Sequence, residues 1–201
     1  MRIFIIGPGW VGKSTSGKIL ANLVDYNFID LDEEFYNNIG NIWDFIKKFW
    51  YESYCFKNSK LFYNILNNSS KDCVISLSSW FLVHENLNEL TENHKKTLNE
   101  QWVILTLLPS KSIEESTNIV VKRQLLRWFG LNEEREKNKF IKRYTIYEKL
   151  WDIQIFSYEK PEVIAKQMQE EIDFFTRNLN KKKFTSRNTC YQNISIDHEV
   201  R

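Results

Sequence analysis

The sequence predicts a three-layer α/β fold around a five-stranded parallel sheet. Short apolar runs alternate along the chain with longer segments of helical periodicity. The first apolar run leads through a glycine-rich turn into a helical pattern. With 201 residues, 42% hydrophobic and 15% aromatic, the chain can bury one sizeable core, so we expect a single domain.

The opening strand and helix frame a phosphate-binding motif. Residues 2–6 are apolar, residues 7–15 read Gly-Pro-Gly-Trp-Val-Gly-Lys-Ser-Thr, and residues 13–24 have helical spacing. The loop fits G-x-x-x-x-G-K-[ST], and strand, loop and helix are the context that this motif requires. The sequence therefore predicts a P-loop fold that binds ATP with Mg²⁺.

The loop assigns a role to each residue type. Glycine lets backbone N–H groups turn toward phosphate oxygens, and the following helix directs its positive end at them. Lys13 would reach the β- and γ-phosphates, and the Ser14 hydroxyl would coordinate Mg²⁺. The residues expected to contact ATP here are Gly9, Trp10, Val11, Gly12, Lys13, Ser14 and Thr15.

The second expected strand, residues 27–32, ends in two carboxylates. Ligands of open parallel sheets lie beyond the carboxyl ends of the strands, so Asp30 and Asp32 should lie near the phosphate loop. Strand alternation would put both on one side, with Leu31 opposite. One carboxylate can approach Mg²⁺ and the other can accept a proton from a substrate hydroxyl. Alternatively, Asp32, Glu33 and Glu34 merely cap and charge the next helix.

Later segments continue the alternation. Residues 41–67 predict helix with a break near 51–53, and most of its aromatic side chains are expected in the core. The other expected elements are strand 73–77, helix 86–99, strand 101–108, helix 112–121, strand 151–157 and a last helix from Pro161 to about 177.

Arginines cluster late in the chain. Four of the eight lie at 123, 127, 135 and 143. Gly130 and Asn132 interrupt this stretch, which predicts a mobile lid over about 119–135 that carries Arg123 to the transferred phosphate. The alternative is a salt-bridged surface helix over 133–149.

Composition indicates which kinds of partner and which cellular compartment to expect. The net charge of +2 shows no basic stripe, so no nucleic-acid partner is expected. No apolar run approaches the roughly 20 residues of a membrane span, and no signal peptide is recognised. Cys55, Cys73 and Cys190 lack metal-ligand spacing and suit a reducing compartment. We expect a cytoplasmic monomer, with a kinase domain at 1–178 and a loosely held polar tail at 179–201.

These motifs, in this order, resemble the shikimate kinase family over roughly residues 1–178. The similar segments are 4–15, the Asp-x-Asp of 28–34, residues 39–43 with 54–57, Arg123-Gln-Leu-Leu, Arg143-Tyr-Thr-Ile-Tyr and Pro161. The resemblance implies a nucleoside-monophosphate-kinase-like fold with a lid, ATP, Mg²⁺ and a place in aromatic amino acid biosynthesis.

The resemblance also implies residue roles. Lys13 and Arg123 would stabilise the transferring phosphoryl group, and Asp30 would lie near Mg²⁺. Asp32 would bind the accepting hydroxyl and act as base. Arg143 would clamp a substrate carboxylate, and Pro161 would lie beside the adenine.

The sequence departs from the family in the acceptor half of the site. Lys57 stands where the family has an arginine, and Lys60 stands where it has a glutamate. Ser78, Ser79 and Trp80 replace three consecutive glycines that lie against the substrate, and residues 41–129 contain no glycine. Trp80 could fill the acceptor space or turn into the core. The donor half, which is the phosphate loop with Arg123 and Pro161, matches the family.

Two functions of different class follow. The first is ATP-dependent phosphorylation of a hydroxyl on a small acceptor, shikimate or a related cyclic polyol or acid. The second is a nucleotide-binding pseudokinase with a degenerate acceptor site and a regulatory or partner-binding role. A nucleotide kinase fits less well, because no arginine occurs between Arg2 and Arg123 to hold a monophosphate.

Overall fold

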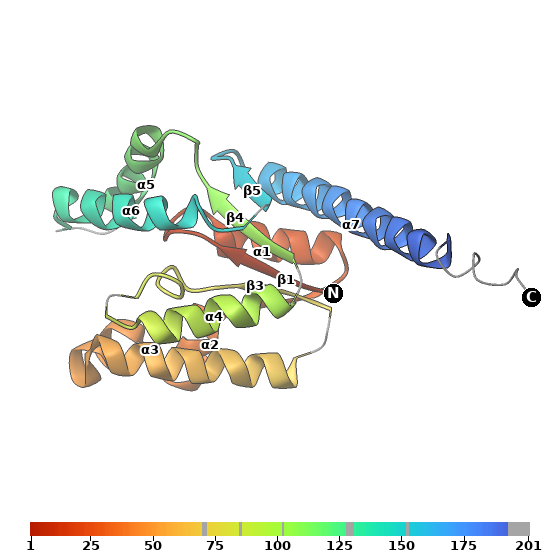
Figure 1. The fold of residues 1–201 in the computed structure, drawn as a ribbon. Helices are drawn as coiled ribbons and strands as arrows, with labels where there is room; N and C mark the ends of the chain where they lie inside the picture. Colours follow the sequence, from red (N-terminus) through yellow and green to blue (C-terminus); the bar gives the residue numbers. More distant parts are fainter. Residues whose placement is uncertain (70–71, 85, 102, 128–130, 152, 193–201) are drawn as a thin grey trace, which may run out of the picture.

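The computed structural model describes residues 1–69, 72–84, 86–101, 103–127, 131–151 and 153–192. A five-stranded, all-parallel sheet of order β2-β3-β1-β4-β5 forms its centre (Figure 1). The strands are β1 Arg2–Ile6, β2 Asn27–Asp30, β3 Cys73–Ser76, β4 Val103–Leu108 and β5 Ile153–Phe156. The helices are α1 Lys13–Leu23, α2 Leu31–Asn38, α3 Ile42–Asn68, α4 Asn88–Gln101, α5 Ile113–Arg127, α6 Glu133–Tyr147 and α7 Pro161–Gln192. The predicted fold class is confirmed.

Neighbouring residues of β1 point to opposite faces of the sheet and define the layers. The Phe4 ring lies 6.2 Å from the Phe62 ring of α3. Gly17 of α1 lies so close to Ile5 that an added Cβ would be 2.8 Å from Ile5 Cδ1. Helix α4 joins α3 through His94, whose ring lies 6.1 Å from Phe62, while α7 packs along α1. The sheet is therefore covered by α1 and α7 on one face and by α3 and α4 on the other.

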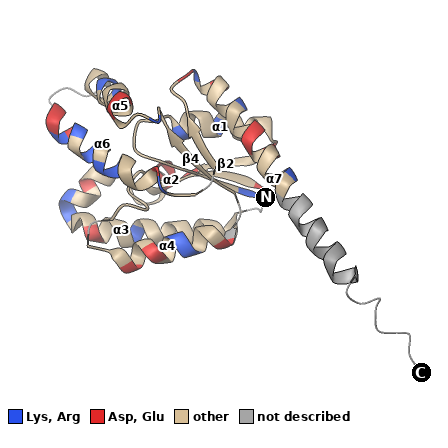
Figure 2. Cartoon of the chain, turned by 45° about the horizontal axis from the view of Figure 1, so that its top comes forward, with Lys and Arg blue, Asp and Glu red and all other residues tan. Residues whose placement is uncertain are grey.

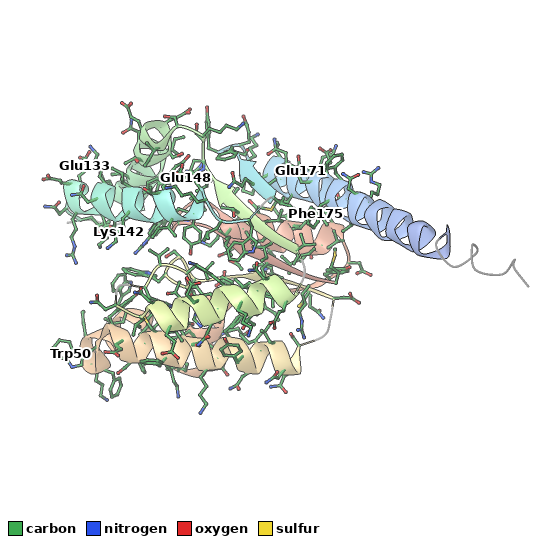
Figure 3. All side chains as sticks on the ribbon, in the orientation of Figure 1. Trp50, Glu133, Lys142, Glu148, Glu171 and Phe175 are labelled. Atoms are coloured by element: carbon green, nitrogen blue, oxygen red, sulfur yellow. The ribbon has the colours of Figure 1, made fainter. Side chains whose placement is uncertain are left out.

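Three helices differ from their predictions. Helix α5 runs to Arg127, six residues past its predicted end at 121, and so includes the first part of the expected lid. The α3 helix is interrupted at Trp50 (φ 68°, ψ 160°), one residue before the predicted break, and the exposed Trp50 side chain lies at this kink (Figure 3). Helix α7 runs to Gln192, well past the predicted end near 177. Residues 193–201 of the expected tail and Gly130 of the expected lid lie outside the described residues. None of the described helices is long and apolar enough to cross a bilayer.

Charges of both signs alternate along the outer helices (Figure 2). On α6, Lys137 pairs with Glu133 and Lys139 with Glu136, each at 2.7 Å. The alternative interpretation of 133–149 as a salt-bridged helix is thus confirmed for Lys137 and Lys139. Arg143 of the same helix points inward instead, at the carboxyl ends of the strands.

Candidate active site

The phosphate loop joins β1 to α1 in a conformation that glycine makes possible. Gly7 (φ +143°) lies against β4, where an added Cβ would be 2.4 Å from the Leu107 carbonyl oxygen. Gly12 (φ +99°) precedes α1, and no side chain caps the helix. The first N–H groups of α1 are therefore available to an anion, as phosphate binding requires.

Lys13 is folded back over this loop. Its Nζ donates to the carbonyl oxygens of Gly7, at 3.0 Å, and Pro8, at 2.8 Å. Burial lowers the pKa of Lys13 to about 8, while the carboxylates of Asp32 and Asp30 act in the opposite direction. Within the described residues the ammonium has no ion-pair partner, so a phosphate oxygen would be a stronger ligand than the carbonyls that it contacts now.

The other residues that the sequence analysis expects to contact ATP fall into two groups. Ser14 and Thr15 are exposed at the start of α1, where a hydroxyl can reach a ligand, whereas Val11 is buried in the core. Trp10 is held at a φ of 69°, which is unusual for a bulky residue. The loop thus presents backbone and hydroxyl groups outward and anchors itself by Val11.

Asp30 occupies a different place from the one that strand alternation predicted. Strand β2 ends at Asp30 and helix α2 begins at Leu31, so the alternation argument is wrong. Asp30 is the N-cap of α2, and its Oδ1 accepts from the backbone N–H of Asp32 at 2.9 Å and of Glu33 at 3.1 Å. The helix start is thus capped by Asp30 and not, as the alternative had it, by Asp32, Glu33 and Glu34, which lie in the first turn. Asp30 still lies close enough to Lys13 to raise its pKa.

Asp32 lies in the first turn of α2 and faces the end of β3. Its Oδ1 accepts a hydrogen bond of 2.5 Å from the Ser78 hydroxyl. Desolvation by the surrounding protein raises the pKa of Asp32 above its usual value; the Ser78 hydrogen bond and Lys13 lower it, and Asp30 raises it further. A carboxylate with a raised pKa is a better proton acceptor than a free aspartate.

Trp80 turns toward Arg143 rather than into the core. The guanidinium carbon lies 3.8 Å from the centre of the indole ring, and the Tyr51 ring packs 5.2 Å from Trp80. Arg143 Nη2 is buried without a hydrogen-bond partner among the described residues, and Nη1 lies beside Gly9 of the phosphate loop. The indole therefore holds the guanidinium in place and leaves its hydrogen-bonding capacity for an anion.

Arg123 of α5 bridges the two ends of the donor half. Its Nη1 donates to the Trp10 carbonyl at 3.4 Å and its Nη2 to the Tyr158 carbonyl at 3.3 Å. Pro161 is the first residue of α7, three positions after Tyr158. The guanidinium thus reaches the phosphate loop directly, as the sequence analysis expected.

Two predicted acceptor residues differ in how they meet the site. Ser79 lies against the phosphate loop, its Oγ 3.5 Å from the position of a Cβ added to Gly9. Lys57 is exposed on α3 and makes no hydrogen bond or ion pair within the described residues. Lys57 therefore makes no hydrogen bond or ion pair that would link it to the site around Arg143 in the described part of the chain.

Sequence reasoning missed polar side chains that line the acceptor half. Asn58 donates from Nδ2 to Ser78 Oγ at 3.2 Å, and the Tyr147 hydroxyl donates to the Ser79 carbonyl at 3.4 Å. Tyr51 and Tyr54 act electrostatically on Arg143. Tyr51, Tyr54 and Asn58 are spaced along one helical face, and this spacing is the signal in the sequence that points to them.

The chain has relatives among known proteins. A profile of the shikimate kinase family matches residues 10–173. The pentafunctional AROM polypeptide of Eremothecium gossypii is 35% identical over 71 residues, and that of Komagataella phaffii is 28% identical over 193 residues, which is 93% of this chain. The chain spans only 4% and 11% of the lengths of these two relatives.

Solved structures agree on the fold. The shikimate kinase of Aquifex aeolicus is 21% identical with a TM-score of 0.66, covering 86% of this chain and 96% of its own. An Acinetobacter baumannii shikimate kinase in complex with shikimate is 18% identical with a TM-score of 0.64, covering 85% and 92%. At such identities the likeness establishes the fold alone. Because the family profile spans most of the residues, the chain belongs to the shikimate kinase family.

Proposed function

We propose that the chain transfers the γ-phosphoryl group of ATP to a hydroxyl of a small anionic acceptor, shikimate or a related cyclic polyol or acid. The observation that carries the proposal is the meeting of Lys13, Asp32 and Arg143 at one edge of the sheet. A phosphate ligand, a proton acceptor and an unpaired guanidinium together supply what such a transfer needs.

The step is an in-line displacement. The acceptor oxygen forms a bond to the γ-phosphorus, the bond from that phosphorus to the β–γ bridging oxygen breaks, and ADP leaves with the electron pair. Asp32 takes the proton of the acceptor hydroxyl. Lys13 and Arg123 neutralise charge that grows on the transferring group, and both reach the phosphate loop.

The donor half fits ATP and Mg²⁺ on its own features. The uncapped start of α1 and the buried ammonium of Lys13 suit a polyphosphate. The Ser14 hydroxyl and the Asp30 carboxylate would hold Mg²⁺, which supplies charge neutralisation on the phosphates when bound. Asp30 retains Oδ2 for this role, because its capping bonds use Oδ1 only.

The acceptor half argues against efficient use of shikimate itself. Trp80 occupies space beside Arg143, where a glycine would leave room. Lysine cannot make the planar two-point contact with a carboxylate that arginine makes, so Lys57 would leave Arg143 as the main anchor. Each change would cost about 1–3 kcal/mol of shikimate binding, by analogy with lost pocket contacts.

The position of the Trp80 indole beside Arg143 supports a second candidate function. If the indole closes the acceptor space entirely, the chain would bind nucleotide without transferring phosphate and act as a pseudokinase. The two candidates share the donor half and differ only in turnover with an acceptor.

Acceptor-dependent ATP turnover separates them. The full chain is assayed with ATP–Mg²⁺ and shikimate, related cyclitols and hydroxy acids, or no acceptor, beside a Lys13→Ala control. Phosphorylation of at least one acceptor above the no-acceptor rate, lost in Lys13→Ala, supports the kinase. Nucleotide binding with no turnover on any of these acceptors would favour the pseudokinase, and no nucleotide binding at all would remove both.

A further inference from the structure

A buried serine joins Asp32 to helix α3. Ser78 follows β3, its hydroxyl donates to Asp32 Oδ1 at 2.5 Å, and Asn58 Nδ2 donates to the same hydroxyl oxygen at 3.2 Å. Ser78 and Asn58 are both almost fully buried. The chain of hydrogen bonds thus ties α2, the end of β3 and α3 together at the candidate base.

The direction of this chain follows from the chemistry of its ends. An ionised carboxylate only accepts hydrogen bonds, so Ser78 must give its single proton to Asp32. The serine oxygen can then only accept, and the NH₂ of Asn58 faces it. Asp32 Oδ2 accepts no hydrogen bond from the described residues, which leaves it for the hydroxyl of the acceptor.

We propose that Asn58 and Ser78 are positioning residues, which hold Asp32 so that Oδ2 faces the acceptor hydroxyl and Oδ1 stays engaged. The inference rests on the proposed function in giving Asp32 the role of proton acceptor. Ser78 stands where the family has a glycine, which has no side chain that could hold Asp32. In this chain the Ser78 hydroxyl makes that contact.

Electrostatics within the site agree with this role. The Ser78 hydrogen bond lowers the pKa of Asp32 and opposes desolvation, which raises it. The other titratable groups that act on Asp32 or are acted on by it are Lys13 of α1, Asp30 of β2, Tyr54 of α3 and Tyr147 of α6. Removal of the serine hydroxyl leaves these groups in place, so its effect on Asp32 can be measured separately.

The experiment compares Ser78→Ala and Ser78→Thr in the full chain. Ser59→Ala is the matched control, because Ser59 is also a buried serine on this face but bonds His94 at 2.8 Å instead of Asp32. Crystal structures of the variants give the orientation of the Asp32 carboxylate, and turnover with ATP–Mg²⁺ and an accepted substrate gives kcat and KM. Asn58→Ala tests the outer link if the changes at residue 78 do not fold.

We expect the Asp32 carboxylate of Ser78→Ala to leave the orientation that it has in the unaltered protein. Asn58→Ala should disturb this orientation less, and Ser78→Thr and Ser59→Ala should leave it unchanged. With an accepted substrate, kcat should fall about tenfold in Ser78→Ala while KM for ATP stays the same, because the proton acceptor is misplaced. An unchanged Asp32 orientation in Ser78→Ala, or an equal change in Ser59→Ala, would overturn the proposal. The orientation of Asp32 decides this even if no acceptor is turned over, so it does not depend on the fate of the proposed function.

Discussion

The donor and acceptor halves of the site are built in different ways. The donor half is one continuous loop with its flanking strand and helix, completed by Arg123. Most of the groups that it offers to a phosphate are backbone N–H groups. The acceptor half is assembled from side chains of α2, α3, α6 and the end of β3. A site made of backbone depends on a few glycines and persists when side chains change, whereas a site made of side chains changes with each substitution.

The largest expected effect falls on the donor half. Lys13→Ala removes the ammonium that is held over the phosphate loop. Turnover should fall on the order of 100- to 1000-fold, the usual loss for one transition-state donor, and nucleotide binding should weaken. Calorimetric titration with ATP–Mg²⁺ and a turnover assay check both parts. Equal nucleotide affinity in Lys13→Ala would contradict the assignment of the loop as the donor site.

Arg123→Ala should separate transition-state charge from nucleotide binding. Its guanidinium donates to two backbone carbonyls, those of Trp10 and Tyr158. We expect turnover to fall about 10- to 100-fold while ATP affinity changes little, because the charge acts mainly on the transferring group. The control is Arg135→Ala on the exposed surface of α6. A parallel loss of affinity and turnover would make Arg123 a ground-state ligand instead.

The acceptor-side helical layer should be sensitive to acid. His94 stacks on Phe81 at 3.9 Å, and burial lowers the pKa of both His94 and His84 to about 4. Between pH 6.5 and 4 the unfolded chain binds protons at these sites that the folded chain does not. The free energy of unfolding should therefore decrease as pH falls through this window, by up to about 1.4 kcal/mol per pH unit for each histidine.

Urea unfolding at several pH values measures this slope. Carboxylates also titrate near the bottom of the window, so His94→Gln isolates the contribution of the histidine. The slope between pH 6.5 and 5 should become shallower in this variant. An identical slope would show that His94 is not held neutral.

The smallest effect concerns the kink that carries Tyr51 toward Trp80. Trp50 is 80% exposed at φ 68° and ψ 160°, a region that favours glycine. Trp50→Gly should relieve strain and stabilise the fold by about 1 kcal/mol, after the greater chain entropy of glycine is subtracted. Trp43→Gly, in a regular turn of the same helix, should destabilise it by a similar amount. Thermal unfolding of the pair tests the expected opposite signs.

The difference between the donor and acceptor halves explains which features could be predicted from the sequence. The phosphate loop, the five strands and the break in α3 follow from local patterns, and each was placed within a few residues. The alternation of Asp30 and Asp32 was misjudged, because the capping of α2 by Asp30 ends the strand before Asp32. Local propensity for strand and for a capped helix competes there, and tertiary context decides.

The acceptor half could not be predicted in the same way. The direction of Trp80 depends on Arg143, which lies on a distant helix. Asn58 lies on a helix rich in aromatic residues, and its link to Ser78 and Asp32 joins three elements. No local period signals such contacts, since they arise only when the elements pack.

We propose that the donor half is complete and that Trp80 and Lys57 set the acceptor half apart from that of the family. The most direct test is kcat/KM for shikimate in the unaltered chain and in Lys57→Arg with Trp80→Gly, with Ser78 retained to hold Asp32. We predict weak or no use of shikimate by the unaltered chain, a gain of tenfold to a hundredfold in the double variant, and an unchanged KM for ATP. Efficient phosphorylation of shikimate by the unaltered chain, with no gain in the variant, would contradict it.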